Sequence, residues 1–285
     1  MTKITIIGAG LLGTSIAKRL SENNFKIKIW NRSSISQDIL KKNNWELITD
    51  INNGIYDCDY ILTLLSDGPA TLSVLKTINS LKDKILICMS TTSIDEIKLI
   101  NKEVLNKEGK FLESPMLGSR PEAECGKLII FTSGDKEIYE KSLKLLNCLS
   151  SNPKHIGAHG KAMTIKLSLN HLIGMMTYSF SNSLHFIKES GINEEKFMEI
   201  LRISSLYAPN FDKKLKRMIT GDFDNPNFTL EMLLKDLILF NQESNKKDIN
   251  NLLLEILIKL LNENIHTKNK QDYSSIFSFS NKKYI

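Results

Sequence analysis

Short runs of β-branched and other apolar residues alternate with stretches that read as helices over about the first 160 residues. Strands that alternate with helices in this way are typical of an α/β fold with a doubly wound parallel sheet, which we therefore predict. Ligands of such folds bind at the carboxyl ends of the strands. The expected strands are residues 3–7, 26–30, 60–65, 85–89, 111–113 and 128–132, and helices are expected at 11–20, at 70–81 and from about 95.

Residues 162–187 form the longest apolar stretch of the chain, with no proline and one interior glycine. A helix of this length would be ~39 Å long, and its apolar character nearly all round predicts a buried helix that joins two domains. Its one charged residue is Lys166, and Asn170 follows on the same helical face. A membrane span would also fit the length, but too many polar groups oppose it: Lys166, Asn170, His171, Asn182 and His185.

Beyond about residue 160 the strand pattern stops, and the rest of the chain reads as helices. We therefore expect an α/β domain at residues 1–160, an interdomain helix at 161–190 and an all-helical C-terminal domain at 191–285. The helices of that last domain are expected at 193–203, 230–244 and 247–262, with a loop at 221–227.

Composition and charge add only modest constraints. Of 285 residues, 41% are hydrophobic and 25% are charged, which is ordinary for a soluble globular protein. The net charge of +6 comes from scattered lysines, so we expect a solvated surface that suits an anionic small ligand, with no nucleic-acid or membrane partner. The first residues read as a strand, not as a signal peptide. The four cysteines form no C-x-x-C pair or metal spacing, which predicts free thiols in the cytoplasm and no metal site.

A glycine-rich turn follows the first predicted strand directly. It reads Gly8-Ala9-Gly10-Leu11-Leu12-Gly13, it opens a helix, and a second strand follows at residues 26–30. Strand, G-x-G-x-x-G, helix and strand within about 30 residues is the context of a dinucleotide-binding site, although the same glycines also suit a turn that is merely tight. The glycines allow the backbone to approach a pyrophosphate, and the helix N-terminus offers it N–H donors. We predict that these six residues hold a dinucleotide.

The end of the second strand indicates which dinucleotide binds. NAD sites place an acid there to bond the ribose hydroxyls, but this chain has Asn31-Arg32-Ser33 and no acid before Asp38. Arg32 can pair with a 2′-phosphate and stack on adenine, while Asn31 and Ser33 add hydrogen bonds. The pattern favours NADP(H) over NAD, and the alternative is an ordinary surface arginine.

Lys166 has two interpretations. A lone ammonium on a buried helix costs free energy unless it is used, which favours a catalytic role. A lysine near a helix start also often reaches solvent along its aliphatic stem. The spacing alone leaves both open.

Together, these motifs resemble the β-hydroxyacid dehydrogenases, the family of 3-hydroxyisobutyrate dehydrogenase, and most of all its glyoxylate/succinic semialdehyde reductases. The resemblance covers essentially the whole chain. The matches, in order, are Gly8-x-Gly10-x-x-Gly13, Asn31-Arg32-Ser33, Leu64-Leu65-Ser66-Asp67, Met89-Ser90-Thr91, Glu113-Ser114-Pro115-Met116-Leu117-Gly118-Ser119 with Pro121 to Leu128, Gly160 with Lys166 and Asn170, Lys235-Asp236-Leu237, and Asp272-Tyr273-Ser274.

The resemblance implies an N-terminal NADP-binding Rossmann domain, a long interdomain helix and a helical C-terminal domain that serves substrate binding and self-associates as a homodimer or homotetramer. It implies an NADPH-dependent reductase that interconverts a small semialdehyde or 2-oxo acid, such as glyoxylate, succinic semialdehyde or methylmalonate semialdehyde, with the hydroxy acid. By the same resemblance, Lys166 is the general acid/base and Asn170 holds the substrate. Leu65 and Ser66 lie beside the adenosine, Thr91 and Lys235 lie at the nicotinamide, and Met116, Leu117, Gly118, Ser119 and Asp236 bind substrate.

The sequence departs from the family pattern in its substrate loop. Leu117 stands where the family usually has a substrate-binding serine, so the pocket becomes more apolar and the hydroxy-acid substrate is in question. Backbone N–H groups near Gly118 and the Ser119 hydroxyl remain as donors to a carboxylate, and Arg120 either joins them or faces solvent. Cys88 replaces an acid that many members carry, and we expect it to pack.

Two alternatives remain open from these residues. An imine reductase or other carbonyl reductase of the same fold is one, because Leu117 allows it although Lys166 argues against it. A non-catalytic NADPH-binding module is the other, and the presence of both Lys166 and Lys235 opposes it.

Overall fold

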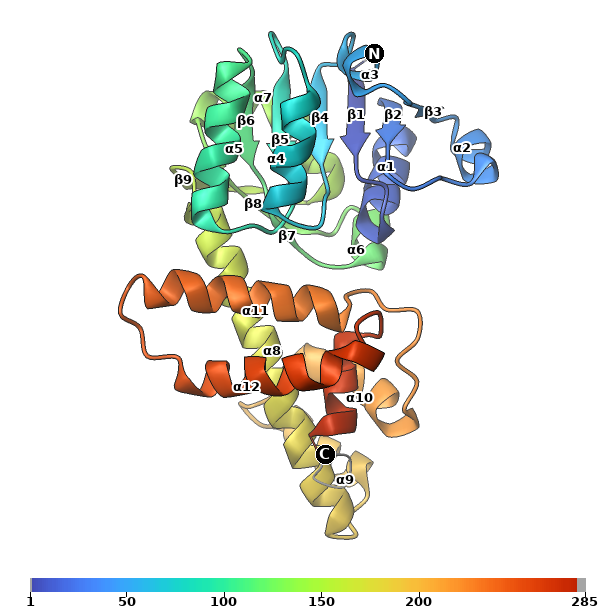
Figure 1. The fold of residues 1–285 in the computed structure, drawn as a ribbon. Helices are drawn as coiled ribbons and strands as arrows, with labels where there is room; N and C mark the ends of the chain where they lie inside the picture. Colours follow the sequence, from blue (N-terminus) through green and yellow to red (C-terminus); the bar gives the residue numbers. More distant parts are fainter. Residues whose placement is uncertain (1, 281–285) are drawn as a thin grey trace. The chain divides into compact units, whose positions relative to one another are not determined.

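The computed structural model describes residues 2–280, and the chain divides into two compact units, Met1–Lys166 and Leu167–Ile285. The boundary lies inside the longest helix, α8 (Lys161–Glu189), so the predicted interdomain helix belongs partly to each unit. Figure 1 shows the α/β architecture of the first unit and the helices of the second. In the part of the chain that the structure describes, no helix is long and apolar enough to cross a membrane.

The first unit is built on a sheet that, within residues 2–280, has nine strands in the order β3-β2-β1-β4-β5-β6-β8-β7, with β9 paired to β8. Six of them run parallel; five of these were predicted, whereas the two-residue β3 was not. The central members are apolar because helices cover both faces of such a sheet. These six are β1 (Lys3–Ile7), β2 (Lys26–Trp30), β3 (Glu46–Leu47), β4 (Tyr60–Thr63), β5 (Ile85–Cys88) and β6 (Lys110–Glu113).

Strand β8 (Ile129–Gly134) departs from the parallel arrangement. It runs antiparallel to β6 and to the short strand β7 (Met116–Leu117), whereas β9 (Lys154–Gly157) pairs with it in parallel. The connection from β6 holds the two-residue strand β7 and the five-residue helix α6 (Arg120–Glu124), and it lacks the long helix that usually forms a parallel crossover. Strand β9, whose side chains are half-buried or exposed, has no apolar run that could have predicted it.

The helices of the first unit pack their apolar faces on this sheet, and one buried cluster joins them to the strands. Helix α4 begins at Gly68, earlier than predicted, because the Asp67 side chain accepts the N–H of Ala70 and Pro69 suits a first helical turn. The helices are α1 (Leu11–Glu22), α2 (Gln37–Asn43), α3 (Ile51–Ile55), α4 (Gly68–Thr77), α5 (Ile94–Asn106), α6 and α7 (Lys136–Leu149).

The second unit is helical, as predicted, and is built around α8 and α11 (Leu230–Asn245). The interior glycine of α8, Gly174, has a packing role, since a Cβ there would lie 2.9 Å from a methyl group of Leu237 on α11. The other elements are α9 (Glu194–Ile203), α10 (Pro209–Thr220), α12 (Leu252–Asn264) and the 3-10 helices η1 (Ile265–Thr267) and η2 (Tyr273–Phe279).

Two of these elements differ from expectation. Helix α12 starts five residues later than predicted, because Asp248 has a positive φ and ends the preceding turn. Helix α10 was not predicted, since its lysine-rich sequence hides the apolar face that Leu215 and Met218 bury.

Candidate active site

The glycine-rich turn after β1 has the geometry of a dinucleotide cradle. Gly8 has φ +106°, and a Cβ there would lie 2.4 Å from the carbonyl oxygen of Leu64. A Cβ on Gly13 would lie 2.0 Å from the carbonyl oxygen of Gly8. In contrast, a Cβ on Gly10 would meet no atom of the described chain within 4 Å. The first and third glycines are therefore required by packing, and the second faces open space that a ligand can occupy.

The first turn of α1 suits an anion. Gly10 is its N-cap and supplies no side-chain cap, and no acidic residue lies in the first turn. The leading N–H groups of a helix have no intrahelical partner and carry partial positive charge. The loop of Gly8, Ala9, Gly10, Leu11, Leu12 and Gly13 thus fits a pyrophosphate on an observed geometry.

At the end of β2, Asn31 connects this loop to the next one. Its Oδ1 accepts the backbone N–H of Ala9 at 3.0 Å, and its Nδ2 donates to the Ser33 hydroxyl at 2.9 Å. Arg32 is exposed between them. The segment therefore presents a cation and no carboxylate where a ribose would lie, and this arrangement fits a 2′-phosphate.

The ends of β4 and β5 complete this edge of the sheet, since β1, β4 and β5 are adjacent parallel strands (Figure 1). The backbone N–H of Leu65 donates to the Ser90 hydroxyl at 2.9 Å, so Ser90 holds the predicted adenosine segment in place. Ser66 is exposed and donates to Asp67, while Thr91 is half-buried. No local sequence pattern indicates that Ser90 positions this segment.

In the predicted substrate loop, the two donors of Ser119 are already engaged. Gly118 has φ +130°, and the hydroxyl and backbone N–H of Ser119 both donate to Glu122, at 2.5 and 2.9 Å. The two Ser119 groups are among those that we expected to bind a substrate carboxylate, so a substrate would have to displace the Glu122 carboxylate to reach them. The flanking residues are the buried Met116, the half-buried Leu117 and the exposed Arg120.

Lys166 lies in the second turn of α8 and is half-buried, so its side chain is not simply a solvated one. The turn before it is held to the sheet by side chains. Glu113 at the end of β6 accepts the N–H groups of Gly160 and Met163, and Ser133 on β8 accepts that of Ala162. Glu113 was recognised from the sequence only as part of a motif, and its contact with α8 was missed.

In the second unit, three of the predicted residues gather between α8 and α11. Asn170 is almost fully buried, and its Nδ2 donates to Oδ2 of Asp236 at 2.5 Å. Lys235 forms an ion pair with Oδ1 of the same buried carboxylate at 2.8 Å. The structure therefore joins Asn170, Lys235 and Asp236 in one cluster, which begins one helical turn after Lys166.

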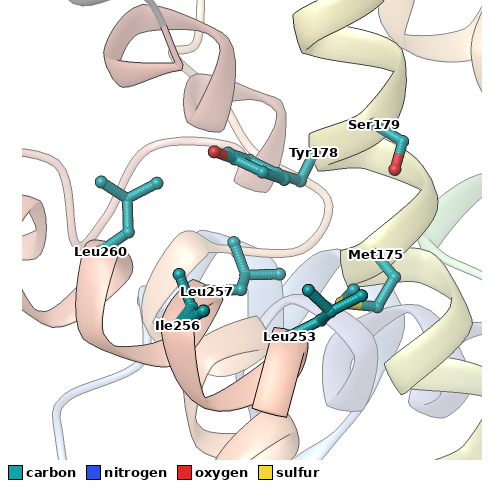
Figure 2. Close-up of a pocket in the computed structure, with 7 residues that line it drawn as sticks. All are labelled: Met175, Tyr178, Ser179, Leu253, Ile256, Leu257 and Leu260. Atoms are coloured by element: carbon teal, nitrogen blue, oxygen red, sulfur yellow. The ribbon is translucent and has the colours of Figure 1, made fainter. Parts of the chain in front are cut away.

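Elsewhere in the second unit, an apolar pocket of about 190 Å³ opens between α8 and α12. Figure 2 shows that its walls are almost entirely hydrocarbon, with Tyr178 and Ser179 as the hydroxyl-bearing members. None of its lining residues was predicted as a site residue. The pocket is lined by Met175, Tyr178, Ser179, Leu253, Ile256, Leu257 and Leu260.

Comparison with known proteins supplies the class. Residues 3–157 match the NAD binding domain of 6-phosphogluconate dehydrogenase, and residues 160–279 match the domain described as NAD-binding of NADP-dependent 3-hydroxyisobutyrate dehydrogenase. The chain is 30% identical over 242 residues to glyoxylate/succinic semialdehyde reductase 1 of Arabidopsis thaliana, covering 83% of each chain.

Solved structures show the same fold. The 3-hydroxyisobutyrate dehydrogenase of Mycobacterium tuberculosis superposes with a TM-score of 0.84 at 15% identity, covering 98% of each chain. A reductive aminase from Aspergillus terreus, solved with NADPH, has a TM-score of 0.66 at 19% identity, covering 99% of this chain and 100% of that one.

The chain therefore belongs to the β-hydroxyacid dehydrogenase family. It is an NADP-dependent oxidoreductase of the kind that acts on CH–OH groups.

Proposed function

We propose that this protein is an NADPH-dependent reductase of a small semialdehyde or 2-oxo acid, such as glyoxylate, succinic semialdehyde or methylmalonate semialdehyde. The observation that carries the proposal is a half-buried Lys166, held near the start of α8 one turn before a buried Asn170. The same chain has a cradle that fits NADP. The 30% identity to a glyoxylate/succinic semialdehyde reductase supports the substrate class.

The proposed chemistry assigns a proton to Lys166. NADPH, when bound, supplies a hydride to the carbonyl carbon of the substrate. The Lys166 ammonium stabilises the negative charge that grows on the carbonyl oxygen and donates a proton from Nζ to it. A positioned general acid of this kind contributes typically ~10²–10⁴-fold to the rate. In the oxidation direction the neutral amine of Lys166 accepts the hydroxyl proton.

Asn170 supports this step through its orientation. The bond from its Nδ2 to Oδ2 of the buried Asp236 carboxylate fixes the rotation of the amide, and the Lys235 ammonium lies 2.8 Å from the other oxygen of that carboxylate. A side chain fixed in this way orients a bound substrate without a loss of rotamer entropy on binding. Thr91 and Lys235 are proposed to serve the nicotinamide end of the cofactor, and Leu65 and Ser66 the adenosine end.

The substrate loop keeps a second candidate open. Leu117 cannot donate a hydrogen bond, and Glu122 occupies both donors of Ser119. Fewer donors are therefore available to a substrate carboxylate here than in the usual family pattern. This arrangement favours a carbonyl or imine substrate that lacks a carboxylate. An imine reductase or other carbonyl reductase is therefore the alternative function.

Self-association and location complete the proposal. Helix α12 exposes Leu252, Leu253 and Ile256, which adjoin or line the apolar pocket of Figure 2. We propose that this face of the second unit supports a homodimer or homotetramer, since exposed apolar patches commonly mark protein interfaces. The four free thiols suit a reducing cytoplasm.

The experiment that tests the function follows NADPH oxidation at 340 nm with five substrates: glyoxylate, succinic semialdehyde, methylmalonate semialdehyde, a plain aldehyde and a cyclic imine. Turnover of the three carboxylate-bearing aldehydes alone supports the main proposal. Preference for the plain aldehyde or the imine supports the alternative. No turnover of any of the five, together with tight NADPH binding, contradicts the proposed substrates and favours an untested substrate or a non-catalytic binding module.

Lys166→Ala tests the catalytic role. We expect turnover to fall by at least ~10²-fold, while NADPH binding, measured by fluorescence titration, stays within about threefold, because the lysine acts on the substrate oxygen. Lys161→Ala is the matched control, since Lys161 is an exposed lysine at the start of the same helix. Lys166→Ala activity within about tenfold of wild type would contradict the role.

A further inference from the structure

The first turn of α8 is capped by side chains that come from distant strands. The carboxylate of Glu113 accepts the backbone N–H of Gly160 at 2.6 Å and that of Met163 at 2.5 Å. The Ser133 hydroxyl accepts the N–H of Ala162 at 2.7 Å. The leading N–H groups of a helix lack intrahelical partners, and here β6 and β8 provide them. The start of α8 is therefore attached directly to the sheet.

The chain before α8 cannot provide such a cap. Residues 157–160 read Gly-Ala-His-Gly, and a side chain on Gly160 would be strained by φ +91° and would lie 2.9 Å from Ile94. Ordinary helix capping uses a Ser, Thr, Asp or Asn immediately before the helix. Glu113, which lies 47 residues before Gly160, replaces that local residue.

We propose that Glu113 is a positioning residue for Lys166. Glu113 acts by fixing the turn of α8 that immediately precedes the lysine. This inference rests on the proposed function of Lys166. Met163, whose N–H Glu113 holds, is three residues before Lys166 and thus lies on the same side of the helix. A displacement of about 1 Å at a catalytic group can cost about 10²-fold in rate, so an anchor at this distance matters for catalysis.

The charge of Glu113 determines how well it holds the helix. As a carboxylate it accepts both N–H groups, whereas the protonated acid has a hydroxyl that faces one of these donors and cannot accept in the same way. Glu113 is fully buried, and this burial raises its pKa to about 7 although the two N–H donors lower it part of the way. The anchor is therefore expected to weaken as the pH falls through about 7.

The groups around Glu113 do not compete for this titration. Cys88 on β5 is buried, and burial raises the pKa of its thiol to about 11. His159, which leads into α8 and contacts Phe111 of β6, has a pKa lowered by burial, so its ring is neutral at pH 7. Ser133 of β8 is uncharged, and within the described chain no side-chain cation pairs with Glu113.

The test compares Glu113→Gln with Ser133→Ala, which removes a cap of the same turn that does not titrate. In the wild type, kcat for the best substrate is expected to fall below an apparent pKa of about 7. Glu113→Gln should lower kcat at pH 8 by at least ~10-fold, leave the NADPH Kd within about threefold and abolish this acid limb. Ser133→Ala should lower kcat but keep the limb. An unchanged kcat and pH profile in Glu113→Gln would overturn the inference.

Glu113→Asp provides the conservative variant if the glutamine variant folds poorly. It keeps the charge on a shorter side chain, so we expect a reduced kcat with the acid limb retained. Loss of the limb in this variant would contradict the assignment of the titration to the carboxylate at this position.

A measurement without turnover separates this inference from the proposed function. Hydrogen exchange of a peptide that covers residues 158–168 is expected to speed up at least ~10-fold in Glu113→Gln, with no change in a peptide from α1. Faster exchange in a protein that reduces none of the five substrates would support the anchor while the proposed function fails. Unchanged exchange would overturn the anchor whatever the enzyme reduces.

Discussion

The two units hold their polar groups in different ways. In the first, the cofactor cradle is made of backbone groups, and its three glycines lie within six consecutive residues of the chain. In the second, buried charges are held by side chains that are 58 and 66 residues apart, as in the pair Lys214–Asp272 and the contact of Asn170 with Asp236. A site made of backbone is therefore disrupted by substitutions that add side-chain atoms, such as Gly to Ala. A site made of side chains is disrupted by substitutions that remove a partner.

The difference follows from the cost of burial. A backbone N–H carries no net charge, so the N–H groups of a cradle can remain exposed to solvent at a helix end until the ligand binds. A buried carboxylate or ammonium must have its partner present at all times. Asp272 is fully buried and receives Lys214 on both oxygens at 2.8 Å, and burial lowers the pKa of Lys214 in spite of that pair.

The largest expected effect comes from breaking that pair. Asp272→Ala leaves the Lys214 ammonium buried without its partner and also removes the acceptor of Ser274, so we expect a loss of about 3–5 kcal/mol in unfolding free energy. Asp212→Ala is the matched control, because Asp212 pairs with Arg202 while both are about one third exposed, and it should cost no more than about 1 kcal/mol. Urea unfolding followed by circular dichroism measures both, and equal costs would contradict the distinction.

Two glycine variants test the backbone site by adding a methyl group instead of removing a partner. Gly13→Ala places a Cβ 2.0 Å from the Gly8 carbonyl oxygen, so it should lower stability by about 1–3 kcal/mol and impair NADPH binding. Gly10→Ala meets no atom of the described chain within 4 Å, so stability should change by less than about 0.5 kcal/mol while NADPH affinity falls at least tenfold. Thermal unfolding and fluorescence titration separate the two. A Gly10→Ala protein that binds NADPH normally would show that the ligand does not use this space.

The smallest effect on stability is expected at the exposed cation. Arg32→Asp replaces a charge-assisted contact to the 2′-phosphate with a repulsive one, and such contacts are worth about 1.5–3 kcal/mol. We expect the preference for NADPH over NADH to fall by at least ~10-fold, with stability unchanged, since Arg32 is solvent-exposed. Kd values for both cofactors provide the measurement, with Lys41→Ala as a control for the loss of an exposed cation nearby. An unaltered ratio would exclude Arg32 as the group that reads the 2′-phosphate.

The sequence by itself determined the features that depend on local backbone. The predicted alternation of strands and helices, the long helix and the helical second half are all observed, and the glycine loop with Asn31 and Arg32 pointed to NADP before any contact was known. These features can be predicted from the sequence because hydrophobic periodicity and glycine spacing are patterns of residues close together in the chain. The family resemblance also indicated the class that the comparisons show.

Only the tertiary structure decided the direction of β8 and the partners of the buried charges. Glu113 reaches α8, Asn170 reaches Asp236, and Lys214 reaches Asp272, each across more than 40 residues. No local pattern specifies such pairs, because a buried polar group finds its partner only when packing has brought two distant segments together. The chain's own pattern thus defines where the backbone can bind, and the packed structure defines which side chains hold the reacting groups in place.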